Sequence, residues 1–108
     1  RPPDLIKLDV EGAEMAVLQG ARELLAHTPP MFLMEMEEKT LAAAGASKAA
    51  IQRFLTGYGY RAAHLSKGRW HATTDVQGVK GRNIFWFNSG VEAHRRLAAL
   101  LPVHGENL

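Results

Sequence analysis

Cysteine is absent from this chain of 108 residues, and long apolar runs and surplus charge are also scarce. Without cysteine there are no disulfides, no cysteine-based zinc sites and no thiol catalysis, which suits a reducing, cytoplasmic compartment. No apolar segment approaches the roughly 20 residues that span a bilayer, so no membrane partner is expected. The formal net charge is only +2. Such a small surplus disfavours a nucleic-acid-binding protein, whose basic residues are concentrated on one surface.

What the chain does contain is typical of one small globular domain. Hydrophobic residues make up 46% and charged residues 22% of the sequence, which argues against disorder. The chain begins "RPPDL", with no initiator methionine and no signal peptide. We therefore expect a piece of a longer protein.

Apolar periodicity predicts strands that alternate with helices. Ile6, Leu8 and Val10 alternate with polar residues, as in a strand, and the following apolar positions recur at helical spacing until "HTPP". "MFLMEM" is a nearly continuous apolar run that fits a buried strand. The predicted strands are 5–10, 31–36, 61–66 and 83–89, and the predicted helices are about 11–27, 47–57 and 91–101.

The order of these elements predicts an α/β fold. Strands that alternate with helices favour parallel pairing through right-handed crossovers. The last two strands have no helix between them, so they are expected to pair antiparallel. The segment between them, residues 67–82, is rich in glycine and charge and is predicted to be a loop. The final residues are expected to fray.

The chain contains, in order, the segments "IKLDVEGAE" (Ile6 to Glu14), "VLQGA", "MFLMEM", "GYGYR" and "NIFWFN". Together they resemble the C-terminal half of an FkbM-type methyltransferase domain. The resemblance covers Asp4 to about Asn88, so residues 1–90 would be the half-domain and 91–108 a C-terminal helix and tail. It implies half of a Rossmann-like sheet of parallel strands with crossover helices and an antiparallel final strand.

The resemblance also implies an activity. Such enzymes use S-adenosylmethionine, and O-methylation of a sugar or other small-molecule hydroxyl is expected. In such enzymes the strand with the glycine-rich cofactor loop would precede residue 1. The isolated chain is therefore expected to be inactive.

Three carboxylates mark the expected active-site edge. Open α/β sheets bind ligands beyond the carboxyl ends of their strands. Asp9 and Glu11 follow the first strand and Glu35 lies near the end of the next, about 4.8 Å away if the strands are neighbours. Carboxylates there can orient a substrate hydroxyl or take its proton. We therefore take Asp9, Glu11 and Glu35 as catalytic candidates, with Asp9 also the first candidate for cofactor contact.

Each candidate also has a structural interpretation. Asp9 could cap the helix, where a side-chain oxygen accepts a backbone N–H, and Glu11 could favour the helix dipole. Glu35 could accept a hydrogen bond from a helix N-terminus. Gly12 costs helix stability, which makes sense if a ligand or a neighbouring strand approaches its backbone, so it is the second cofactor-binding candidate. These alternatives stay open at this stage.

Expectations for the remaining polar residues are structural. Glu14 is expected to be solvated or paired with a basic residue, and Lys7 to pair with Asp9. The five histidines show no ligand spacing, so no metal site is predicted. Trp70 either packs on the sheet edge or, with His71, reaches over a substrate. Basic residues in the "KGR" segments are expected to be solvated.

A non-catalytic function is the alternative. A half-sheet would leave one strand edge without a neighbour, and such an edge invites pairing with another chain. The chain would then act as an interaction module and form a homo-oligomer.

Overall fold

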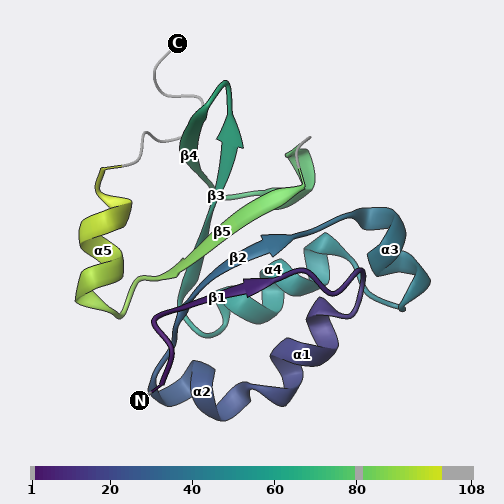
Figure 1. Ribbon diagram of the computed structural model, residues 1–108, viewed down its shortest axis with the longest axis horizontal. Coiled ribbons are helices and arrows are strands. Elements are labelled where there is room, and N and C mark those ends of the chain that lie inside the picture. Colours follow the sequence, from purple (N-terminus) through teal and green to yellow (C-terminus); the bar gives the residue numbers. More distant parts are fainter. Residues whose placement is uncertain (1, 80–81, 101–108) are drawn as a thin grey trace.

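The described part of the chain, residues 2–79 and 82–100, forms a five-stranded mixed sheet in the computed structural model (Figure 1). The strand order is β1-β2-β5-β3-β4. β1 and β2 pair in parallel, and the other neighbouring pairs are antiparallel. The strands are β1 (Leu5–Leu8), β2 (Met31–Glu35), β3 (Tyr60–Ser66), β4 (Arg69–Thr73) and β5 (Asn83–Asn88). The α/β class is confirmed, and so is the antiparallel pairing of β3 with β5.

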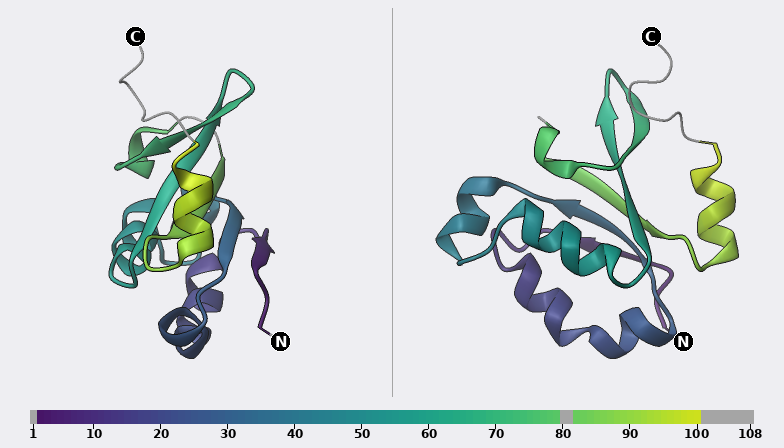
Figure 2. Two further views of the ribbon diagram at one scale, coloured as in Figure 1. Left: turned by 90° about the vertical axis from the view of Figure 1, so that its left-hand side faces the viewer. Right: turned by 180° about the vertical axis from the view of Figure 1, so that it is seen from behind.

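Helices connect these strands. They are α1 (Glu14–Gly20), α2 (Arg22–His27), α3 (Glu38–Ala43), α4 (Lys48–Thr56) and α5 (Glu92–Ala98), together with a short 3-10 helix, η1 (Val76–Gly78). Figure 2, in the view from behind, shows α4 lying along the sheet with α1 nearby. Figure 1 shows α5 apart from the other helices, beside β5. The predicted fraying of the last residues, 101–108, lies outside the described residues.

The connection from β1 to β2 differs from the single helix predicted over about 11–27. The first turn of α1 begins only at Glu14, and the helix is interrupted at Ala21, whose φ of −106° and ψ of 19° are not helical. The interruption follows Gly20, a residue that weakens helices. Leu18 and Leu25 nevertheless remain buried against the sheet. Two short helices thus make the crossover that sets β1 parallel to β2.

The core lies between the sheet and the helices α1 to α4. Its largest fully buried side chains are Trp86, Tyr60, Phe32, Leu18 and Leu25. The Tyr60 ring lies 5.6 Å from that of Phe32 between centroids, and its hydroxyl donates a 2.6 Å hydrogen bond to the Pro30 carbonyl. Burial raises the pKa of Tyr60, so this hydroxyl keeps its proton and the bond. The Pro-Pro end of the crossover is thereby tied to β3.

The prediction of a loop over residues 67–82 is wrong for its first part. Residues Arg69–Thr73 form β4, an edge strand that pairs with β3 in the register Leu65↔Trp70 and His64↔His71. Lys67 and Gly68 both have positive φ, 52° and 75°, which is the geometry of a tight two-residue hairpin turn. Trp70 packs on the sheet edge, 6.0 Å from the Phe85 ring between centroids.

Helix α4 begins behind a serine N-cap. Ser47 has an extended backbone, and its Oγ accepts the N–H of Ala50 at 3.0 Å, as expected of an N-cap serine. The preceding helix, α3, lies in a stretch for which neither a helix nor a strand was predicted. Glu37 is the N-cap residue of α3, and its side chain forms no hydrogen bond to the first N–H groups of the helix.

Helix α5 is attached to the sheet through a buried histidine. His94 is 4% exposed, and its Nδ1 accepts the backbone N–H of Asn88 at 2.8 Å. Accepting this bond requires a neutral ring with the proton on Nε2. Burial lowers the pKa of His94, partly opposed by the charge of Asp4. The neutral form is therefore the one that holds α5 against β5.

This arrangement predicts that the chain becomes less stable in mild acid. Because the His94 pKa is lower in the folded than in the unfolded state, the unfolded chain binds more protons, and stability falls as pH drops through about 6.5. His94→Asn keeps an acceptor in a similar place without a titrating ring. We expect it to flatten the slope of the free energy of unfolding between pH 8 and 5.5, measured by urea denaturation, at a cost within about 1 kcal/mol at pH 8. An unchanged slope would contradict the assignment.

Candidate active site

Two of the predicted carboxylates lie where the neighbouring strands β1 and β2 end. The parallel register ends with Leu8 paired to Met34, and Asp9 and Glu35 are the next residues along the two strands. Parallel neighbours are about 4.8 Å apart. Asp9 is exposed, and the Glu35 side chain is 33% exposed. Both acids thus lie at the carboxyl edge of the β1–β2 pair, the edge at which the sequence analysis expected them.

The third candidate, Glu11, sits in a strained turn directly after β1. Glu11 and Gly12 both have positive φ, 44° and 101°, and the Ala13 N–H closes the turn on the Val10 carbonyl at 3.2 Å. A left-handed backbone costs a residue with a side chain roughly 1–2 kcal/mol. Strain of this kind is often kept at functional sites. Glu11 is exposed in this turn, as is Asp9 two residues before it.

Gly12 is needed because another backbone approaches it closely. A Cβ at this position would lie 2.3 Å from the Thr40 carbonyl oxygen in α3, far inside van der Waals contact. The expected close approach is therefore present, and its partner is a helix backbone. The space beside the Gly12 α-carbon is filled by the chain itself.

The residue that organises this turn is Glu14, and the expectation for it is wrong. It is 1% exposed, and its carboxylate accepts the N–H groups of Val10 at 3.2 Å and Gly12 at 2.9 Å. Asp9 is not the helix cap either, because α1 begins at Glu14 behind Ala13, which makes no side-chain cap. Glu14 thus binds the turn amides of Val10 and Gly12, and the capping interpretation of Asp9 is wrong. The side chain of Asp9 is left for other contacts.

Arg82 is the basic residue of this edge that the sequence interpretation missed. Its guanidinium contacts Glu35 at 3.0 Å and Glu37 at 2.5 Å, and its carbonyl accepts the Met36 N–H. The hydrogen bond to Glu37 and then the charges of Glu35, Glu37 and Asp9 raise its pKa, so it stays charged. The sequence placed Arg82 only in a solvated "KGR" segment. Strand pairing of β5 with β2 brings it to Glu35.

Other expectations for this edge have mixed outcomes. Glu35 bonds to Arg82 and not to a helix N-terminus. Within residues 2–79 and 82–100, no ion pair joins Lys7 to Asp9.

The same residues contain no group of three or more acids and histidines placed to hold a metal ion. None of their helices is long and apolar enough to cross a membrane.

Comparison with known proteins identifies the family. Residues 1–62 match the family model of the methyltransferase FkbM domain. The match takes in β1, the Glu11–Gly12 turn, β2 and α4, and it ends in β3. No curated protein and no solved structure matches the chain. Because the matched residues make up more than half of the 108, the chain belongs to the FkbM methyltransferase domain family.

Proposed function

We propose that the chain provides part of the active-site edge of an S-adenosylmethionine-dependent O-methyltransferase that acts on a sugar or other small-molecule hydroxyl. The observation that carries this proposal is the position of Asp9 and Glu35 at the carboxyl ends of two neighbouring parallel strands, in a member of a methyltransferase family. Ligands of open α/β sheets bind at such ends. The half-sheet of a larger Rossmann-like domain is part of the same proposal.

The free carboxylates fit the cofactor's chemistry. S-adenosylmethionine carries a cationic amine and ribose hydroxyls, which carboxylate oxygens can bind. Asp9 and Glu11 are exposed, and no described residue forms an ion pair with either of them. Gly12 fits less well as a contact, because Thr40 fills the space beside it and Glu14 binds its N–H. We therefore give Gly12 the role of closing the turn that presents Asp9 and Glu11.

The second strand end is suited to the acceptor. Arg82 fixes the carboxylates of Glu35 and Glu37, which limits the positions that Glu35 can take. A fixed carboxylate can orient an acceptor hydroxyl and accept its proton as the oxygen becomes the nucleophile. Holding the hydroxyl in line would supply much of the remaining acceleration. When bound, the cofactor supplies the methyl group.

The test is a titration of the ¹⁵N-labelled chain with S-adenosylmethionine. Because we propose that the glycine-rich cofactor loop lies outside this chain, we expect weak, millimolar binding with shifts at the Val10–Ala13 turn and at Glu35. Asp9→Asn should weaken binding about tenfold, the equivalent of about 1.4 kcal/mol lost with a charge-assisted bond. Glu23→Gln, which removes an exposed carboxylate on α2, is the matched control and should change nothing.

Two results would count against the proposal. Low-micromolar binding by the chain alone would show that the cofactor site is already complete. Shifts that avoid the turn, or equal affinities for Asp9→Asn and Glu23→Gln, would remove Asp9 from the site.

A second candidate function is self-association through β1. β1 ends the strand order of the sheet, so its outer edge has no neighbour among the described strands, and Leu5 on it is 53% exposed. Light scattering, together with the cofactor titration, distinguishes the two functions. A tight dimer that shows no cofactor-induced shifts supports an interaction module. A monomer that shows these shifts supports the enzyme.

A further inference from the structure

One face of the sheet is open. Among the described elements, helices α1 to α4 pack on the opposite face, over the hydrophobic core. Figure 1 looks at the sheet from its open side, with β1 in front of α4, and the view from behind in Figure 2 shows α4 in front. Directly paired residues share a face, and side chains alternate along each strand. The registers therefore assign to this open face Leu33 and Glu35 of β2, Phe85 of β5, Arg61 and Leu65 of β3, and Trp70 of β4.

The sequence of β2 is that of a strand covered on both faces. On the core face, Phe32 and Met34 are 2% and 0% exposed. Met31 and Leu33, on the open face, are equally apolar and yet only half-buried. Strands with such continuous apolar runs normally have both faces covered. The open side of β2 thus has the composition of a buried surface.

Aromatic side chains gather on the same face. The Phe85 ring lies 6.0 Å from that of Trp70 and 6.4 Å from that of Phe87, between centroids. Leu65, which is paired with Trp70, is 45% exposed. Within the described residues, none of these four side chains belongs to the core on the helical side. They form a second apolar cluster, and partly exposed clusters of this kind mark association surfaces.

Opposite charges lie on the two sides of this cluster. Glu35 is paired with Asn83, and Arg61 is paired with Phe87, four residues further along β5. Four residues of an antiparallel strand span about 13–14 Å. Because β5 lies between β2 and β3, Phe85 is midway between the two charged residues.

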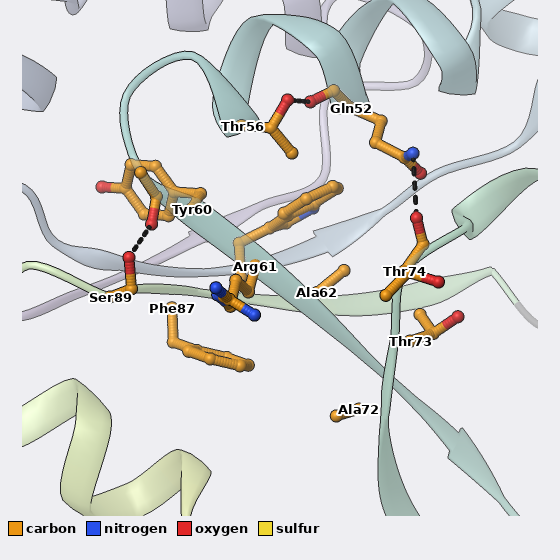
Figure 3. Close-up of a pocket in the computed structure, with 12 residues that line it drawn as sticks. Gln52, Thr56, Tyr60, Arg61, Ala62, Ala72, Thr73, Thr74, Phe87 and Ser89 are labelled. Carbon is orange, nitrogen blue, oxygen red and sulfur yellow. Dashed lines mark hydrogen bonds between the residues drawn. The ribbon is translucent and has the colours of Figure 1, made fainter. Parts of the chain in front are cut away.

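Each charged end can accept a further partner. Arg61 is exposed and forms no ion pair with a described acid. Figure 3 shows its side chain beside Phe87, away from the labelled side chains of α4. At the other end, Arg82 is shared between Glu35 and Glu37, one positive charge against two negative ones. The Glu35 side chain is 33% exposed, so a second cation can reach it.

We propose that the open face binds the open face of a second copy of this chain. A two-fold axis between the two sheets, passing over Phe85, brings Arg61 of each copy to Glu35 of the other. Such an interface is self-complementary, so this ion pair forms twice. The axis runs across the line from Glu35 to Arg61, so the strands of the two copies cross steeply, close to the orthogonal packing of sheets. Packed sheets lie about 10 Å apart, a gap that an arginine and a glutamate can bridge.

The size of the open face predicts a weak dimer. Five strands spaced by about 4.8 Å, each of roughly five residues, give an area of about 400 Å² per copy. A standard interface buries about 800 Å² per partner, so we expect a Kd on the order of 100 µM. The inference does not rest on the proposed function. Because Glu35 also lies at the proposed methyl-transfer edge, dimer formation and acceptor binding at Glu35 would compete.

Sedimentation equilibrium of the 108-residue chain measures the association, at concentrations from about tenfold below to about tenfold above the expected Kd. Arg61→Glu and Glu35→Arg should each raise the Kd about tenfold or more, because each sets like charges together at both ion pairs. The double variant reverses both charges and should associate more tightly than either single variant. Arg53→Glu, at an exposed arginine of α4 on the opposite side of the sheet, is the matched control and should leave the Kd unchanged.

Three results would overturn the proposal. The first is a chain that stays monomeric over the whole concentration range. The second is an equal Kd for Arg61→Glu and Arg53→Glu, which would place any dimer elsewhere, such as at the outer edge of β1. The third is a double variant that associates no better than the single variants. Because this experiment measures association and the cofactor titration reports shifts at the Val10–Ala13 turn, either proposal can fail without the other.

Discussion

Replacement of Gly12 by alanine is expected to lower the free energy of unfolding by about 3 kcal/mol or more. The added Cβ would lie 2.3 Å from the carbonyl oxygen and 2.9 Å from the carbonyl carbon of Thr40. Both are backbone atoms of α3, so they cannot swing aside as a flexible side chain would. The left-handed φ of 101° adds its own cost for any residue with a Cβ. Relief would require α3 to move away from the turn.

Urea denaturation followed by circular dichroism measures this loss. Gly20→Ala is the matched control, because it makes the same change at a helical glycine with nothing within 4 Å of the new Cβ. We expect Gly20→Ala to be neutral or to stabilise the chain by up to about 1 kcal/mol. Equal losses of unfolding free energy in the two variants would show that the contact with Thr40 is not what requires glycine at position 12.

The strands could be predicted where their pattern is local. Alternation in β1 and the apolar run of β2 identified both to within a residue or two, and "NIFWFN" coincides with β5. β4 was missed because its residues, "RWHAT", contain only one large apolar side chain, Trp70, and lie among glycines and charges. Its pairing is set by the Lys67–Gly68 turn, and the sequence shows a Lys-Gly pair where hairpins usually have Asn-Gly.

The candidate site could be predicted in outline only. Neighbouring parallel strands end at the same edge of a sheet. The order of β1 and β2 therefore already implies that Asp9 and Glu35 share one edge. Arg82 reaches them through the antiparallel insertion of β5 between β2 and β3, a contact between residues 47 apart that no local pattern encodes. The burial of Glu14 also escaped prediction, because a glutamate in a first helical turn is ordinarily exposed. Its role depends on the turn at Glu11, whose positive φ is atypical of glutamate.

Replacement of Glu14 by glutamine is expected to cost about 2–3 kcal/mol, a large effect for the exchange of one atom. The carboxylate uses Oε2 for the Val10 N–H and Oε1 for the Gly12 N–H. Glutamine keeps one oxygen and turns an NH₂ group toward the other N–H, so two donors face each other. With Glu14 1% exposed, water cannot bridge them. The turn that presents Asp9 and Glu11 should loosen.

Hydrogen exchange locates this loss as well as measuring it. In Glu14→Gln the amides of Val10 and Gly12 should exchange at least about tenfold faster. The exchange rates of the β3 amides should change only as much as the free energy of global unfolding changes. Glu23→Gln removes a carboxylate that is 95% exposed on α2 and should be neutral within about 0.5 kcal/mol. If Glu14→Gln were as mild as Glu23→Gln, the buried carboxylate would not be what holds the turn. If it loosened the turn but left cofactor-induced shifts at Asp9 intact, the methyl-transfer edge would not require the strained geometry of Glu11.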